Sequence, residues 1–212
     1  MADDLTITRG FPDALRSDVA FLYDAAFGSK LAIAIPDAPR RLRLLEEALD
    51  SPHSFVALSG GKALGIAGFK TPSGALTSGI SPKLLRTYLG LVGALRAMVI
   101  LALFERKLSP GELLMDGISV SPAARGGGVG TKLLERLKQF AAKEGYRTIR
   151  LDVINTNDGA RRLYERLGFA PTRTSHFRYL RWLLGFSSAT TLEYSVTPSS
   201  NPGMQPTCCA RR

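Results

Sequence analysis

The feature that most constrains the fold of this chain is a strand pattern that runs directly into a dense cluster of glycines. Residues 113–120 are apolar with β-branched members, which is typical of a strand, and Pro122 ends that strand because proline cannot donate to a ladder. Residues 131–142 then carry apolar side chains at helical spacing. The glycines between them are Gly126, Gly127, Gly128 and Gly130. Such a turn leaves backbone N–H groups unpaired at the positive end of a helix, which predicts a phosphate-binding loop.

Two common phosphate-binding loops are excluded by the order of the residues. No Gly-Lys-Ser/Thr occurs, so a P-loop lysine is missing, and the dinucleotide pattern Gly-x-Gly-x-x-Gly fails at Thr131. The pattern that fits is Arg-x-x-Gly-x-Gly, which runs from Arg125 to Gly130. It resembles the acetyl-CoA pyrophosphate loop of the GCN5-related N-acetyltransferase (GNAT) family. An ordinary strand–helix turn is the alternative interpretation.

A second motif follows further along the chain. Residues 151–153 alternate as a strand, and a helical pattern then runs to Gly168, a typical helix stop. The string is Asn157-x-x-Ala160-x-x-Leu163-Tyr164-x-x-x-Gly168-Phe169. It resembles the second signature of the same family, and the order and spacing of the two motifs argue against coincidence. The resemblance extends over roughly residues 5–195, and its specific motifs occupy residues 112–169.

The resemblance implies an α/β fold in which a mixed, mostly antiparallel seven-stranded sheet is flanked by helices on both faces. We expect one N-acetyltransferase domain over residues 1–196. Residues 71–109 depart from the family pattern and predict a helical insertion between strands 3 and 4. Residues 197–212 are rich in Pro, Ser and Gly and predict a disordered tail.

The resemblance also implies which residues hold acetyl-CoA. The strand before the glycines splays from its neighbour in the family, so its backbone groups bind the pantetheine arm, while the glycine loop holds the pyrophosphate. Asn157 binds the pantetheine, caps its helix, or does both. The implied cofactor-binding residues are Ile118, Ser119, Val120, Arg125, Gly126, Gly127, Gly128, Val129, Gly130, Thr131, Asn157 and Tyr164.

Three side chains are candidates for catalysis. Tyr164 matches the family tyrosine that reaches the thioester sulfur, and a phenol can protonate a departing thiolate. Asp116 is the first candidate for the base and Glu112 the second, either of them directly or through a water. Period-two alternation predicts that Glu112, Leu114, Asp116, Ile118 and Val120 share one strand face.

The implied activity is acetyl transfer to a primary amine, of a small molecule or of a protein or peptide, directly within a ternary complex. Two other functions remain open. The chain could sense acyl-CoA without turnover, or it could dock on a membrane surface or a protein partner. A homodimer is also compatible with the sequence, and the acyl-chain preference stays open.

Charge and composition restrict the alternatives further. The net charge is +10, divided between −3 over residues 1–60 and +13 over the rest, and no aromatic-interleaved nucleic-acid motif accompanies it. Cys208 and Cys209 are adjacent and form neither a disulfide framework nor a metal spacing, and His53 and His176 are isolated, so no metal is expected. No basic start followed by an apolar run occurs, so no signal peptide is expected. Together these features favour a reducing, cytoplasmic location.

The rest of the chain predicts the elements around this site. Residues 13–27 form a helix that Gly28 ends, residues 40–49 form a second helix, and residues 54–69 form a hairpin. Residues 180–186 are an apolar connector that could line the acceptor side.

Residues 84–104 are apolar enough to suggest a membrane span. We reject a span because Arg96 would cost roughly 3 kcal/mol near the bilayer centre and because one sheet would be split across the membrane. A helix that covers the acceptor site, forms a dimer interface, rests on a membrane surface or extends the core is expected instead.

Overall fold

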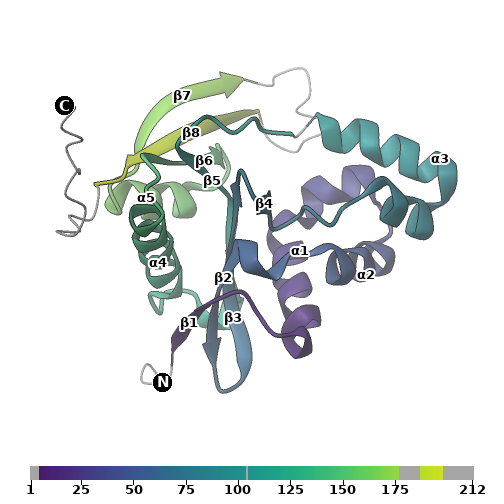
Figure 1. The fold of residues 1–212 in the computed structure, drawn as a ribbon, viewed down its shortest axis with the longest axis horizontal. Helices are drawn as coiled ribbons and strands as arrows, with labels where there is room; N and C mark the ends of the chain where they lie inside the picture. Colours follow the sequence, from purple (N-terminus) through teal and green to yellow (C-terminus); the bar gives the residue numbers. More distant parts are fainter. Residues whose placement is uncertain (1–4, 104, 177–186, 198–212) are drawn as a thin grey trace, which may run out of the picture.

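The computed structural model describes residues 5–103, 105–176 and 187–197, which form one sheet flanked by helices (Figure 1). The order of strands is β1-β2-β3-β5-β6-β8-β7, and a short β4 pairs with β3. Only β5 and β6 are parallel among the paired strands. The strands are β1 (Thr6–Arg9), β2 (Ser54–Ser59), β3 (Lys62–Thr71), β4 (Gly74–Ala75), β5 (Glu112–Val120), β6 (Thr148–Ile154), β7 (Ala170–His176) and β8 (Ser188–Ser195). The mixed, mostly antiparallel sheet is confirmed, with β4 as an added eighth strand.

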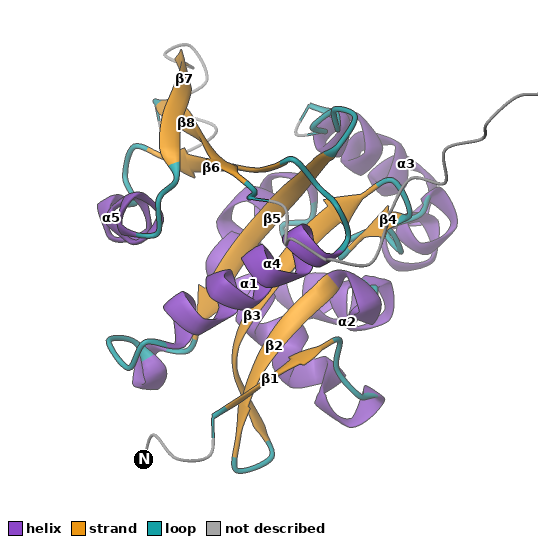
Figure 2. Ribbon diagram, turned by 60° about the vertical axis from the view of Figure 1, so that its left-hand side comes forward, coloured by secondary structure: helices purple, strands orange, loops and turns teal. Residues whose placement is uncertain are grey.

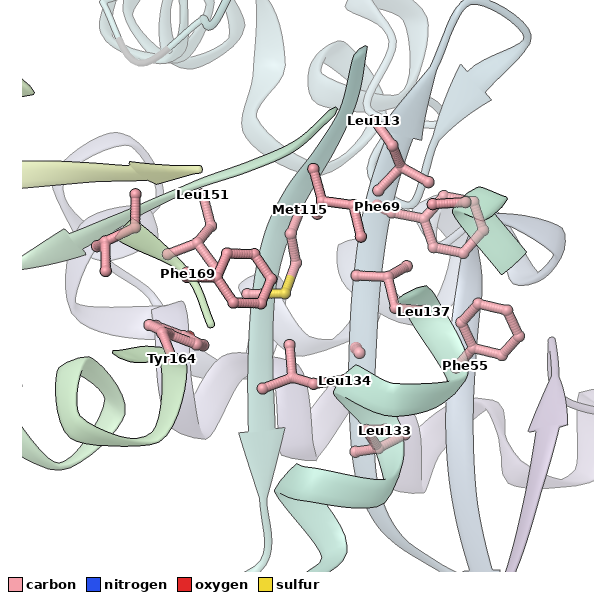
Figure 3. Close-up of a cluster of buried hydrophobic side chains, with 14 of the residues drawn as sticks. Phe55, Phe69, Leu113, Met115, Leu133, Leu134, Leu137, Leu151, Tyr164 and Phe169 are labelled. Atoms are coloured by element: carbon pink, nitrogen blue, oxygen red, sulfur yellow. The ribbon is translucent and has the colours of Figure 1, made fainter. Parts of the chain in front are cut away.

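Helices cover both faces of this sheet (Figure 2). On one face, α4 and α5 pack over a core that includes Phe55, Phe69, Leu113 and Leu134 (Figure 3). On the other face, α1 and α2 pack over Val56 and other residues of β2 and β3. The helices are α1 (Arg16–Ala34), α2 (Ala38–Ala48), α3 (Pro82–Ala102), α4 (Val129–Lys143) and α5 (Asp158–Arg166), with short 3-10 turns at Asp13–Leu15, Ser51–His53 and Pro122–Ala124.

The predicted end of the first helix at Gly28 is wrong, because α1 continues to Ala34. Gly28 lies close to Asp24, one turn earlier, and a Cβ at Gly28 would come within 2.7 Å of the Asp24 carboxylate. That carboxylate binds Arg41 of α2, with the Nε of Arg41 2.6 Å from Oδ1 of Asp24. The glycine therefore leaves room for a mostly buried ion pair between α1 and α2, and it does not end the helix.

The predicted shared face of β5 is also wrong. Gly117 pairs with Gly68 and Met115 pairs with Phe69, so Asp116 is an extra residue in β5, which makes a β-bulge. The bulge reverses the alternation. Met115 lies in the core under α4, and Ile118 packs against the same core. Glu112 and Leu114, which precede the bulge, therefore face away from Ile118 and Val120.

The segment between β3 and β5 contains α3, where the helical insertion is predicted. β3 and β5 are nevertheless adjacent and antiparallel in the sheet. α3 packs on α1 and α2 and bends at Gly90, where φ is 69°. The expected tail after Thr197 and the connector at residues 180–186 lie outside the described residues.

Candidate acetyl-CoA site

The glycine loop joins the end of β5 to the start of α4. Gly126 and Gly128 have φ of 77° and 78°, a conformation that residues with a Cβ rarely adopt. An added Cβ at either position would meet no atom within 4 Å, so these glycines border open space. Gly130 differs, because a Cβ there would lie 3.2 Å from the Leu163 side chain. The absence of a side chain at Gly130 therefore allows α4 and α5 to approach each other.

The loop presents unpaired backbone donors at the N-terminus of α4. Gly128 is the N-cap, and no side chain caps the helix. Within the described residues, no acceptor pairs with the N–H groups of Gly128, Val129, Gly130 or Thr131. Arg125 is exposed, and its Nε donates to the Val120 carbonyl over 3.2 Å, which fixes a guanidinium at the loop entrance. The arrangement suits an anion such as a pyrophosphate.

β5 and β6 are paired over only part of their length. Three residue pairs join them, from Glu112–Thr148 to Leu114–Arg150, and residues 115–120 have no partner in β6. Figure 2 shows β6, β8 and β7 turning away from β5. β5 stays paired with β3 on its other edge. The edge of β5 at Ile118, Ser119 and Val120 is therefore free for a ligand that extends along the strand.

Tyr164 lies on α5, beside this gap. Its ring is buried in the core with Met115 of β5 and lies 6.0 Å from the ring of Phe169, between centroids (Figure 3). Burial raises the pKa of the Tyr164 phenol above its ordinary value. The phenol is therefore in its protonated form at neutral pH, the form that a proton donor needs. Asn157 caps the same helix by accepting a hydrogen bond from the Ala160 N–H over 3.1 Å.

Asp116 lies at the bulge on the opposite face of the sheet, beside α1. Its Oδ1 accepts a hydrogen bond from Nη2 of Arg106 over 3.1 Å, and its Oδ2 is buried without a hydrogen-bond partner among the described residues. Burial raises the pKa of the Asp116 carboxyl, and the charges of Arg106 and Lys70 oppose that rise. Nη1 of Arg106 also binds Oδ2 of Asp152 over 3.2 Å. Arg106 therefore links β5 to β6 at the level where the two strands separate.

Both carboxylate oxygens of Glu112 interact with other residues. Its Oε2 accepts a hydrogen bond from the Ser109 N–H over 2.9 Å. Its Oε1 lies 3.0 Å from Nε of Arg150, an ion pair that lacks the alignment of a hydrogen bond. Both oxygens therefore have structural partners, whereas one oxygen of Asp116 has none.

α1 packs against β5 on the face of the sheet where Asp116 lies. The Ser119 hydroxyl donates to the Leu22 carbonyl over 2.7 Å, and a Cβ on Gly117 would overlap the Phe27 ring, so α1 touches β5 at the bulge. Tyr23 is buried next to Asp116, and burial, followed by the Asp116 charge, raises the pKa of its phenol.

Sequence reasoning missed Arg106, Asp152 and Tyr23. No local pattern marks them, because they meet Asp116 only through the path of the insertion, the pairing of β6 and the packing of α1. Alternation along β6 would have predicted that Asp152 lies on the other face of the strand from Leu151 and Val153. It could not have predicted the contact between Asp152 and Arg106.

Two open hollows, of about 370 and 530 Å³, lie beside Phe11 and beside Leu49, and neither is lined by the glycine loop or by β5. Free backbone groups and the gap between strands define the site instead. Within the described residues, no group of His, Cys, Asp and Glu side chains could hold a metal ion.

Comparison with known proteins decides the family. The model of the acetyltransferase (GNAT) family matches residues 22–169, which include the bulge, the glycine loop and Tyr164. The chain belongs to the GNAT family. The residues that resemble the two family signatures, which occupy residues 112–169, lie within the matched range.

Individual proteins that are similar to this chain are also acetyltransferases by name. A probable N-acetyltransferase, camello, from Xenopus tropicalis is 39% identical over 62 residues, which are 29% of this chain and 28% of that protein. A GCN5-related N-acetyltransferase from Kribbella flavida has a TM-score of 0.58 at 19% identity, over 92% of this chain and 99% of its own. The putative acetyltransferase yncA from Salmonella typhimurium, solved with acetyl-CoA, has a TM-score of 0.55 at 18% identity, over 94% and 98%. The solved structures support the GNAT fold.

Proposed function

We propose that this GNAT chain is an acetyl-CoA-dependent N-acetyltransferase that transfers the acetyl group directly to a primary amine within a ternary complex. The acceptor is the amine of a small molecule or of a peptide or protein. The observation that carries the proposal is the continuity of two free sets of backbone groups: the N–H groups at the start of α4 and the unpaired edge of β5. The acetyl-CoA in the Salmonella structure supports this choice of donor.

The residues present fit a coenzyme A ester. The N–H groups from Gly128 to Thr131 bind the pyrophosphate together with Arg125, since the open space at Gly126 and Gly128 admits it. The backbone of Ile118, Ser119 and Val120 binds the pantetheine arm along the free edge of β5. Asn157 caps α5 and thereby holds Tyr164 beside the arm.

Tyr164 and Asp116 divide the proton transfers between them. They lie on opposite faces of the sheet at the same gap, so a thioester held in the gap is accessible to both. Asp116 accepts a proton from the acceptor ammonium, directly or through a water. The free amine forms the C–N bond as the C–S bond breaks, and Tyr164 gives its phenol proton to the sulfur. The protonated amide nitrogen gives its surplus proton to the Tyr164 phenolate, and solvent takes the proton held by Asp116, so the products are an amide, a thiol and one released proton.

Asp116 takes the role of base in this proposal rather than Glu112. The unpartnered Oδ2 of Asp116 is available to an incoming donor, whereas both oxygens of Glu112 are occupied.

The test is a thiol-release assay with acetyl-CoA and a panel of primary amines, polyamines and N-terminal peptides. We expect CoA release that depends on one class of acceptor, with a matching rise of mass by one acetyl group. A Tyr164→Phe/Asp116→Asn variant serves as the matched control and should bind acetyl-CoA but lose turnover. Tight acetyl-CoA binding without acceptor-dependent release would favour a non-catalytic acyl-CoA sensor.

A further inference from the structure

α3 exposes large apolar side chains along its outer surface. Among the described residues, six large apolar side chains are exposed, and five of them lie on α3 or at its C-cap. Their exposed fractions run from 60% for Leu95 to 82% for Val92. The apolar stripe, as we name it, consists of Leu91, Val92, Leu95, Val99 and Leu103. It extends over about 18 Å of helix at 1.5 Å per residue.

The second half of α3 differs from an ordinary surface helix in the side chains that it buries completely. Its second half buries the small side chains of Ala94 and Ala97 against α1 and α2, while the large side chains of the stripe point outward. A helix of a soluble protein normally buries its large apolar side chains. An exposed apolar patch of this kind marks a surface that binds a partner or a membrane.

α3 cannot cross a bilayer in this fold, although it is long and apolar enough to do so, with a mean hydropathy of 1.6. β3 enters the insertion and β5 leaves it, and the two strands are hydrogen-bonded neighbours in one sheet. A single crossing would place them on opposite sides of the membrane. α3 lies at the rim of the molecule (Figure 1), so it can contact a membrane only along its side.

The charges on α3 identify the partner. Pro82–Ala102 contains Lys83, Arg86 and Arg96 but no acidic residue. Lys83 and Arg86 are exposed and have no ion-pair partner among the described residues. Arg96 flanks the stripe and donates to the Ile33 carbonyl over 2.9 Å. Two copies of α3 packed face to face would bring like charges together, whereas an anionic lipid surface is complementary to them.

We propose that the apolar stripe docks in the plane of an anionic lipid bilayer, with the basic side chains of α3 on the headgroups. This inference goes beyond the acetyl transfer and does not depend on it. Arg106 lies three residues after Leu103 and binds Asp116, so the insertion that carries the stripe also contacts the bulge in β5.

The test is co-sedimentation with vesicles of phosphatidylcholine alone and of phosphatidylcholine with one-fifth phosphatidylserine. We expect at least tenfold stronger partition onto the anionic vesicles. Leu95→Ser/Val99→Ser should lower that partition at least tenfold, because it removes apolar area from the membrane face. Phe21→Ser, which removes an exposed apolar side chain from α1, is the matched control and should bind as the wild type does. Circular dichroism melting checks that each variant is folded.

The contribution of the basic side chains to vesicle binding is measured separately. Lys83→Gln/Arg86→Gln should weaken anionic binding by about fivefold for each charge removed, and raising the salt should weaken wild-type binding in the same direction. The proposal is overturned by equal partition of wild type and Leu95→Ser/Val99→Ser. It is also overturned by binding that resists alkaline carbonate extraction, which would mean a span, or by a stripe-dependent dimer that binds no vesicle.

Discussion

Asp116 is subject to two opposing influences on its charge. Its burial raises the carboxyl pKa, and the neighbouring Arg106 lowers it again. A carboxyl that acts as a base must be ionised, so activity is lost as the pH falls through its pKa. In the proposed mechanism Arg106 is a positioning residue, because its charge opposes the effect of burial on the Asp116 pKa and its Nη2 holds the carboxyl through Oδ1.

Arg106→Gln should move the acidic limb of the kcat/KM profile to higher pH. The change removes the cation that lowers the pKa of Asp116, while burial of Asp116 continues to raise it. The measurement is kcat/KM for the acceptor against pH, with acetyl-CoA saturating. Arg161→Gln, which removes a guanidinium from an exposed pair with Glu165 on α5, is the matched control and should leave the limb in place. An unchanged limb in Arg106→Gln would remove Asp116 as the base.

Tyr164→Phe should lower kcat by about 100-fold or more, the usual loss for a general acid, and leave the acetyl-CoA dissociation constant within twofold. The phenylalanine ring keeps the packing against Phe169 and loses only the hydroxyl. Pre-steady-state thiol release and calorimetry separate the two effects. Equal rates in the two proteins would mean that the buried phenol serves only the core.

At the scale of elements, the N-terminus of α4 is the proposed binding site of the coenzyme pyrophosphate. Gly128→Asp should weaken acetyl-CoA binding by at least 50-fold, because it places a carboxylate among the N–H groups that bind the pyrophosphate. Gly145 is a matched control at the other end of α4, with φ of 76° and equally open space for a Cβ. Gly145→Asp should carry the same backbone strain and leave the affinity unchanged. If both variants bind as the wild type does, the glycine loop is only a turn.

Asn157→Ala should lower the free energy of unfolding by about 1 kcal/mol, since it removes the side-chain cap of α5. For a chain of this size, the melting temperature should fall by about 2–4 °C. Asn157→Asp retains a capping oxygen and should restore the melting temperature. An affinity for acetyl-CoA that falls in both variants would show that the amide also contacts the coenzyme.

Local signals in the sequence predicted the elements well where the cause was local. Pro122 ended β5, the glycines gave the turn before α4, and Gly168 stopped α5 with φ of 83°. The signals failed where a distant residue decided the outcome. Gly28 resembles a helix stop, but the Asp24–Arg41 pair requires a glycine inside α1. Simple alternation likewise could not reveal the bulge at Asp116.

At the scale of the whole molecule, the sheet is divided at its single parallel pairing. β1 to β5 form one continuous antiparallel half, and β6, β8 and β7 form the other, with both joined near Glu112. The bulge, the glycine loop and Tyr164 all border the part of the gap that stays unpaired. The family resemblance predicted that β5 and β6 separate. It could not predict that Arg106 contacts Asp116, because that contact depends on the course of an insertion that the resemblance does not cover.

The insertion gives the molecule a second specialised surface. It leaves the sheet after β3, builds the apolar stripe on α3 and returns through Arg106 to the bulge in β5. One segment therefore links the rim of the molecule to the acceptor side of the gap.

The most direct test of the central claim is calorimetric titration of acetyl-CoA into the purified protein, with Gly128→Asp measured in parallel. We predict saturable binding of one acetyl-CoA per chain that unacetylated CoA competes for, and its loss in Gly128→Asp. The absence of saturable binding by the wild-type protein would contradict the assignment of the glycine loop and the free edge of β5 as the coenzyme site.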